Sequence, residues 1–302
     1  MYSEKRDMRQ SRLPVKQNLS LQMLIPMTFV LMWSSGAIFA KLGLEFTGPL
    51  TFLALRLILS WIIIGSLCLI IRPEFPCNMG QWRHILLTGL FLQTGYQTFF
   101  FYALAHGVSP GLLTIILGMQ PIVTQGFSKD HVGILQWVGL ILGLLGLVLV
   151  VTASLVIGNI SVTGIGSALL SLTSITVGTF LQKKVKTNQL ASIAIQYAGS
   201  AGILTGLALF FEHFVTHWTP AFVAALGWMV LMVSVGATML LYWMIQRGSL
   251  TRVTSLFYSV PAVTAVLDYA VFGQRLNTEV IVGMLLIMAG LFLINKQSLD
   301  AA

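Results

Sequence analysis

Apolar stretches of 17–25 residues recur from one end of this 302-residue chain to the other. Each is long enough to cross about 30 Å of hydrocarbon as a helix. Hydrophobic residues make up 56% of the chain and charged residues only 9%, whereas soluble domains carry about 25% charged residues. The chain is therefore predicted to be an all-α membrane protein that crosses the bilayer many times.

The apolar stretches predict ten transmembrane helices with mostly short loops between them. The predicted spans are 22–41, 50–71, 84–105, 110–127, 132–152, 162–181, 190–211, 222–244, 251–272 and 278–295. Residues 1–21 are expected to form a basic tail and residues 297–302 a short second tail. No cleavable signal is expected, because the first apolar segment is too long and no small-residue cleavage site follows it.

The basic residues lie on alternate loops, and this placement explains the net charge of +8. If the amino terminus is cytoplasmic, fourteen of the seventeen basic residues fall on the cytoplasmic side. The loops on the other side hold only Lys41 and Arg275, and Arg56 lies inside a span. This asymmetry follows the positive-inside rule and predicts that both termini are cytoplasmic. The charge is thus a topology signal and gives no reason to expect nucleic acid as a partner.

The two halves of the chain resemble each other in sequence. With an offset of 140 residues, the segment 102–124 aligns with 242–264 and matches a tyrosine, a serine, a proline and several threonines. With an offset of 144, Gly139 and Gly146 align with Gly283 and Gly290. A weaker match at 142 aligns the end of the first span with that of the sixth. The chain is therefore predicted to contain two five-helix repeats, 22–152 and 162–296.

Five is an odd number, so the second repeat is expected to enter the membrane from the side opposite to the first. The turn at 105–110 has no lysine or arginine, whereas its counterpart carries Arg247 and Arg252, as this inversion requires. Inverted repeats are an architecture of secondary transporters, whose substrate site lies near the midplane between the repeats. A duplicated scaffold and a channel are the alternatives.

The segment MWSSGAIFAKLGLEFTGPLTFLALRLIL (32–59) resembles the first helix pair of the drug/metabolite transporter superfamily, in its EamA-type branch. The features that carry the resemblance are Trp33, Gly36, Lys41, Pro49 and Arg56. A proline in the fourth helix of each repeat, Pro121 or Pro261, also matches. The resemblance extends over about residues 22–296.

This resemblance implies a ten-helix inner-membrane carrier for small metabolites, commonly an exporter of amino acids or related compounds. The sequence departs from the pattern after the second proline, where the usual Glu-Arg pair reads Gln274-Arg275. The corresponding region of the first repeat reads Lys129-Asp130-His131. Any role of that glutamate is therefore not transferred to this chain.

Polar and aromatic side chains at helical spacing are the candidates to line the substrate pathway. One face of the third span carries Gln93, Tyr96 and Gln97, and a hydroxyl stripe opens the ninth span before Pro261. A proline frees the carbonyl of the residue four positions earlier, which can then bind substrate or an ion. The alternative is that these groups only hold helices together. The expected lining residues are Trp33, Ser34, Gln93, Tyr96, Gln97, Gln120, Trp243, Thr254, Tyr258 and Ser259.

Arg56 and Asp268 are opposite charges that lie alone within predicted spans. At 1.5 Å per residue, Arg56 lies about 9 Å and Asp268 about 7.5 Å from the outer ends of their helices. Three interpretations of Arg56 follow: an ion pair with Asp268 at an outer gate, snorkelling to the headgroups, or attraction of an anionic group of the substrate. Gating or coupling roles are expected for Arg56, Asp268, Pro121 and Pro261.

An intramembrane enzyme is an alternative of another class, but the usual motifs are missing. The sequence contains no HExxH, no aspartate pair within a span and no GxxxxGK[ST]. We therefore expect no enzymatic activity, no cofactor and no metal site, and active transport would have to use a proton or another ion gradient. The expected partners are a small-molecule substrate and the lipid bilayer.

Overall fold

The computed structural model describes residues 19–120, 123, 134–157, 161–247, 260–273 and 277–300. Within these ranges the elements are helical, apart from one isolated β-bridge. The first repeat contributes α1 (Leu19–Gly43), α2 (Pro49–Ile71), α3 (Met79–Gly89), η1 (Leu90–Gly95), α4 (Tyr96–Ala105), α5 (Pro110–Leu117) and α7 (Ile134–Ile157). The second contributes α8 (Val162–Gln182), α9 (Gln189–Phe211), α10 (Pro220–Trp228), η2 (Met229–Ala237), α11 (Thr238–Arg247), α13 (Val260–Phe272) and α14 (Thr278–Asp300).

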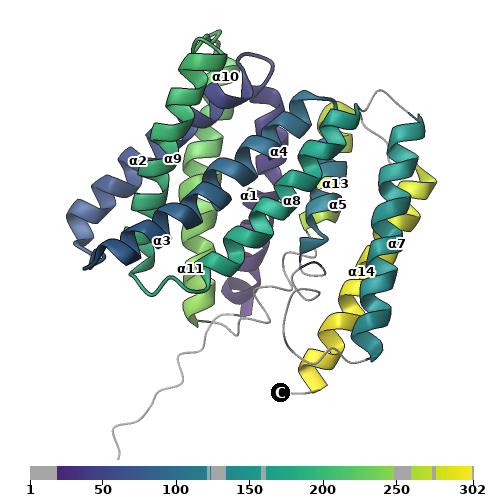
Figure 1. The fold of residues 1–302 in the computed structure, drawn as a ribbon. Helices are drawn as coiled ribbons and strands as arrows, with labels where there is room; N and C mark the ends of the chain where they lie inside the picture. Colours follow the sequence, from purple (N-terminus) through teal and green to yellow (C-terminus); the bar gives the residue numbers. More distant parts are fainter. Residues whose placement is uncertain are drawn as a thin grey trace, which may run out of the picture.

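Short π-helical segments join α3 to α4 and α10 to α11, so the described residues form ten helices (Figure 1). The prediction of an all-α fold is confirmed. Five helices are long and apolar enough to cross a membrane, and their spanning parts are Leu24–Gly43, Pro49–Ile71, Val162–Gln182, Gln189–Phe211 and Pro220–Leu241. The start of α1 and the end of α14 lie at the same end of the molecule (Figure 1).

The predicted span 110–127 is not one continuous helix. The helix α5 ends at Leu117, and Gly118 and Met119 form a turn. The chemical reason is close at hand, because Pro121 has no N–H with which to bond the carbonyl of Leu117. The expectation of a helix from 251 lies partly outside the described residues, which resume at Val260.

Local sequence signals explain where several helices begin. The helices α2, α5 and α10 each have proline near the first position, where a backbone N–H would lack an intrahelical partner anyway. Ser109 and Thr219 cap α5 and α10, because their side chains accept hydrogen bonds from Leu112 N and Phe222 N. Proline in the first turn, together with the capping side chains of α5 and α10, therefore explains where these helices begin.

Helices of one repeat pack mainly against helices of the other. In chain order α2 corresponds to α9, α5 to α13 and α7 to α14, and each of these helices packs against its own counterpart. Two further contacts, of α4 with α8 and of α1 with α10 and η2, are equivalent if the repeats are exchanged, and α1 also packs against α13. The start of α2 meets the end of α9, so that pair is antiparallel. The arrangement is that of two repeats around a pseudo-two-fold axis.

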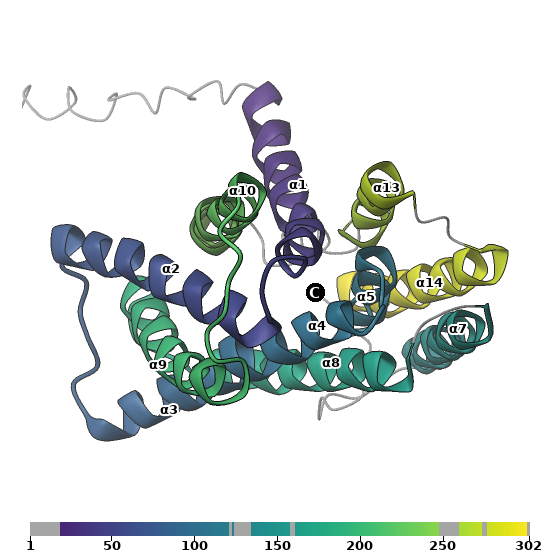
Figure 2. The same cartoon turned by 90° about the horizontal axis from the view of Figure 1, so that it is seen from above.

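The contact between α7 and α14 shows this symmetry in its glycines. A Cβ atom on Gly146 would lie 2.6 Å from the carbonyl oxygen of Gly283, and one on Gly290 would collide with the carbonyl of Gly139. Since Gly139 and Gly146 align with Gly283 and Gly290, the two contacts are equivalent under a two-fold exchange. Gly139, Gly143 and Gly146 are therefore positions where α7 packs closely against α14. The pair stands to one side of the other helices (Figure 2).

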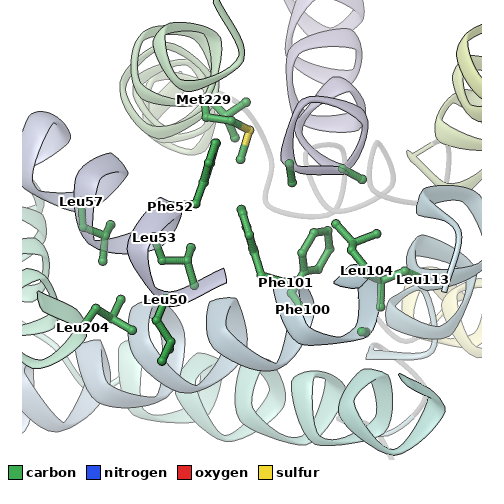
Figure 3. Packing of buried hydrophobic residues seen from close by; sticks show 14 of the residues in the cluster. Leu50, Phe52, Leu53, Leu57, Phe100, Phe101, Leu104, Leu113, Leu204 and Met229 are labelled. Atoms are coloured by element: carbon green, nitrogen blue, oxygen red, sulfur yellow. The ribbon is translucent and has the colours of Figure 1, made fainter. Parts of the chain in front are cut away.

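The core lies where α2, α4, α5 and α10 meet (Figure 3). Phe52 contacts Phe101 and Phe222 with ring centroids 5.3 and 5.8 Å apart, and it is fully buried. Leu53, Leu57 and Leu113 fill the neighbouring space. This apolar packing surrounds the buried polar groups described next and fixes the helices that carry them.

Candidate functional site

Arg56 lies on α2 with only 5% of its surface exposed, inside the helical bundle. Its Nε donates to Ser234 Oγ at 2.8 Å, and Nη1 donates to Gln97 Oε1 at 3.1 Å. A snorkelling arginine would keep its charged tip at the helix end in contact with headgroups. The burial and the two acceptors favour a role inside the bundle instead.

One acceptor of Arg56 lies in a π-helical segment, and the other follows such a segment closely. Ser234 lies in η2, and Gln97 follows η1 by two residues. The two π segments occupy corresponding positions in the two repeats, because an offset of about 140 residues places η1 within η2. A π segment widens the helix and rotates the following residues, and such segments are frequent at functional sites. Here each of them brings a polar side chain to the same guanidinium.

Two tyrosines complete the surroundings of Arg56. Tyr197 on α9 is 3% exposed, and its hydroxyl donates to the backbone carbonyl of Ser234 at 3.1 Å. Tyr96 opens α4 and packs edge-on against Phe100, with centroids 5.8 Å apart. Both tyrosines are close enough to Arg56 to interact with its charge. With the offset of 140–142 residues, Tyr197 lies within one residue of the position in the second repeat that corresponds to Arg56 in the first.

Asp268 is 1% exposed and lies between α13 and the start of α5. Its Oδ2 accepts a hydrogen bond from Gly111 N at 2.9 Å, where the helix dipole favours a negative charge. Its other oxygen, Oδ1, is buried and has no hydrogen-bond partner within the described chain. Phe272 lies one turn further along α13. The Nζ atom of Lys41, on α1, lies over its ring at 4.1 Å from the centroid.

The ion pair between Arg56 and Asp268, one of the three interpretations of the sequence, is not formed here. Arg56 faces η2 and the start of α4, whereas Asp268 faces α5. The depth argument compared only positions along the two helices and carried no information about their lateral position. The interpretation that pairs Arg56 with Asp268 at an outer gate is therefore wrong for this conformation.

Of the other expected lining residues that the structure describes, some contact neighbouring helices and some lie near Arg56. Ser34 lies between α1 and α13, where its Oγ is 3.5 Å from the carbonyl of Val260. Gln120 donates to Thr179 Oγ1 on α8 at 2.9 Å. Gln93 lies partly buried within η1, and Trp33 packs against Phe29 with centroids 5.6 Å apart. Of the expected lining residues, Gln97 and Tyr96 are thus the ones placed at Arg56.

Several expected residues fall outside the described part of the chain. These are Pro121, Thr254, Tyr258 and Ser259, together with the side chain of Trp243. Pro261 is described, and its Cγ lies 3.2 Å from the position of a Cβ on Gly118. That contact joins the end of α5 to the start of α13.

The loops 44–48 and 212–219 are held together at the end of the molecule away from the chain ends, a contact that we call the interloop latch. Thr47 Oγ1 donates to the carbonyl of Val215 at 2.9 Å and lies 3.0 Å from Thr216 Oγ1. The backbone N–H of His217 donates to the carbonyl of Phe46 at 2.9 Å. A β-bridge joins Thr47 and Thr216.

Glu212 strengthens the latch by capping a helix of the other repeat. Its carboxylate accepts from Leu50 N at 3.0 Å and from Thr51 N at 2.8 Å, at the start of α2. A Cβ at Gly48 would collide with this carboxylate, so glycine is needed there. Two orphan donors of α2 are thus satisfied by a charge that its dipole favours.

Replacing Glu212 by alanine is expected to lower the free energy of unfolding by about 1–2 kcal/mol, as for the loss of a charged helix cap. Glu212→Gln should lose less, because its carbonyl oxygen still accepts one of the two bonds. Thermal unfolding of the purified protein in detergent measures both. Glu74→Ala is the control, since Glu74 is exposed in the loop 72–78, and an equal loss in that variant would contradict the capping role.

Sequence reasoning missed Ser234, Tyr197 and Glu212. Ser234 and Tyr197 are isolated polar residues in apolar stretches, and a search for polar residues near Arg56 in the second repeat is the signal that could find them. Glu212 lies directly after the predicted span 190–211. The π segments that turn Ser234 and Gln97 inward leave no recognisable mark in the hydrophobic pattern.

The model of the EamA-like transporter family matches residues 21–152 and again 162–296. This chain belongs to that family. The expected resemblance is confirmed, and the protein is a multi-pass membrane transporter rather than an enzyme. It contains two EamA domains that cover both five-helix repeats.

Relatives and one solved structure agree with this membership. An uncharacterized transporter, YvbV, of Bacillus subtilis is 26% identical over 89% of this chain and 90% of its own. A protein of Salmonella typhimurium named "probable amino-acid metabolite efflux pump" is 23% identical over 87% of this EamA protein and 91% of its own length. A crystal structure with a TM-score of 0.64 and 17% identity covers 93% of the chain and 99% of its own, which shows the shared fold.

Proposed function

We propose that this EamA-family protein is a secondary transporter that exports a small metabolite, an amino acid or a related compound, across the inner membrane by alternating access. The observation that carries the proposal is the interloop latch, which joins two loops at one end of a two-repeat structure and has no counterpart between the described loops 72–78 and 183–188.

Alternating access requires two equivalent sets of contacts of which one is made at a time. Under exchange of the repeats, the latched loops 44–48 and 212–219 correspond to 183–188 and 72–78. Both of these loops are described, and no hydrogen bond joins them. Near this unlatched end, α2, α3 and α9 border an open apolar groove on the surface, and its lining includes the exposed side chains of Trp61, Leu69 and Phe75. The difference between the two ends supports a carrier captured in one of its two states.

The distribution of basic residues supports the orientation of this state. If both chain ends are cytoplasmic, as the positive-inside rule predicts, the latch faces the outside and the unlatched loops 72–78 and 183–188 face the cytoplasm. The conformation is then closed to the outside. His213 and Phe214, next to the latch, have φ of 52° and 56°, a conformation that residues other than glycine adopt only under constraint.

The nature of the cargo rests on the relative whose name refers to amino-acid metabolite efflux. No nucleotide-binding motif occurs in the sequence, so the export would be driven by a proton or another ion gradient. A channel would need a continuous pore lined by carbonyls or charges, and a latch that closes one end favours the carrier.

Counterflow in proteoliposomes tests the proposal. Vesicles preloaded with an unlabelled amino acid are expected to accumulate the same radiolabelled compound transiently, because a carrier exchanges solute across the membrane. The panel would include amino acids, nucleosides, vitamins and cationic drugs, and empty vesicles are the control. Uptake that neither saturates nor shows counterflow would indicate a channel and overturn the carrier proposal.

A further inference from the structure

We infer that Arg56 binds a carboxylate of the transported compound, so that the substrates of this protein carry a single anionic group at the end held by α2. The inference rests on the proposed transport function and names the class of substrate. It starts from the charge that the fold leaves uncompensated.

Arg56 has no carboxylate partner in the part of the chain that the structure describes. By sequence, Asp268 is the one acid in the interior of the predicted spans, since Glu279 lies at the start of its span, and Asp268 is bound at the start of α5. Glu212 is engaged by the start of α2. A charge held inside a membrane protein without a partner costs at least a few kcal/mol, and such residues usually mark a substrate or ion pathway. The missing negative charge is best supplied by the cargo.

The guanidinium retains the donors that such a ligand needs. Arginine has five N–H groups, and the two hydrogen bonds to Ser234 and Gln97 use one from Nε and one from Nη1. The remaining N–H groups, including both on Nη2, have no acceptor in the described residues. A planar fork of this kind matches the two oxygens of a carboxylate, and the apolar surroundings strengthen the attraction.

The two neutral acceptors hold the guanidinium in place without neutralising it. Because Ser234 belongs to η2 and Gln97 follows η1, the orientation of the fork depends on both repeats at once. A ligand that binds Arg56 therefore contacts the point where the two repeats meet. This is the position expected for a substrate in a carrier built from inverted repeats.

The charge of the site favours a monoanionic group over a phosphate. Arg56 is the single lysine or arginine in the interior of the predicted spans, because Lys41 and Arg252 lie at the ends of theirs, so a dianionic phosphate ester would leave a negative charge uncompensated. A carboxylate matches the one positive charge. The nearby rings of Tyr96 and Phe100 offer apolar and π surface to the rest of the molecule.

The test compares amino acids with their carboxamides, which have nearly the same shape but no negative charge. The probes are L-threonine, L-methionine and L-phenylalanine, each paired with its amide, and ligand-dependent thermal stabilisation of the purified full-length protein gives the Kd values. At least one acid is expected to bind wild-type protein tenfold or more tightly than its amide. Arg56→Gln should abolish this preference, weakening the acid and not the amide, and Arg56→Lys should keep part of it.

Arg83→Gln is the matched control, since it removes the same charge from an exposed position on α3. It should keep the wild-type preference. Equal weakening of acid and amide in Arg56→Gln would indicate a structural role and overturn the inference. The comparison on wild-type protein decides the matter even if Arg56→Gln does not fold, because amides that bind as tightly as acids also overturn it.

The results distinguish a failure of the carboxylate site from a failure of the carrier proposal. If amides or amines bind and show counterflow while acids do not, the carrier proposal stands and the carboxylate site is wrong. If no compound of any class in the full panel shows counterflow, the carrier proposal itself fails.

Discussion

A disulfide formed across the interloop latch is expected to reduce transport by at least about tenfold, because it would hold the protein in one of two exchanging states. The variant combines Thr47→Cys and Thr216→Cys. These residues form an antiparallel bridge, in which opposite Cα atoms lie about 4.5–5.5 Å apart. That separation lies within the range of disulfides. Reduction should restore transport.

The native thiols set the background for this experiment. Cys77 is exposed and Cys68 is buried, so Cys77→Ser removes the accessible competitor. The measurement is counterflow before and after oxidation, with the cross-link quantified by mass spectrometry of the intact protein. The single-cysteine variants should be insensitive to oxidation. Wild-type counterflow in fully cross-linked protein would mean that the latched loops do not separate during transport.

Gly290→Leu should be among the most destabilising single substitutions in the chain. A Cβ at Gly290 would collide with the carbonyl of Gly139 and lie 2.9 Å from the backbone nitrogen of Gly143. Backbone atoms cannot move aside as a flexible side chain can, so α7 and α14 must separate. Overpacking of this kind costs about 1–3 kcal/mol or more. The midpoint of thermal unfolding, followed by size-exclusion chromatography after heating, measures the loss.

Gly202→Leu is the matched control for this variant. Gly202 is also in the middle of a helix, but nothing lies within 4 Å of a Cβ built there. The same change in volume should therefore leave the melting midpoint within a few degrees of the wild type. Equal destabilisation of the two variants would show that a large side chain is tolerated no better at an open glycine position, and that the close approach of α7 and α14 is not responsible, since leucine has a higher helix propensity than glycine.

The fold was predictable from the sequence to the extent that periodicity and repetition determine it. The offset that aligned Gly139 with Gly283 and Gly146 with Gly290 found residues that the structure places in contact. The contacts themselves are exchanged, with Gly139 against Gly290 and Gly146 against Gly283, as a two-fold axis requires. An alignment shows which residues correspond, and only the packing shows which of them touch.

The candidate site was predictable only in part. Gln97 and Tyr96 were selected from a face at α-helical spacing, and both lie near Arg56. Gln93 was selected by the same spacing, but it lies within η1, where the wider turn breaks the relation between spacing and face. The partner of Arg56 was sought among acids at the same depth. The depth of a residue in a span can be counted along the sequence. The residue that faces it from another helix cannot be found in this way.

The close contact between the glycines of α7 and α14 has a consequence for biosynthesis. Residue 139 leaves the ribosome about 150 residues before residue 290, a delay on the order of ten seconds at ordinary translation rates. During that interval the glycine face of α7 can meet only lipid or a chaperone. A premature stop codon before α14 would leave α7 permanently without its partner helix. We expect membrane quality-control proteases to remove such a chain rapidly.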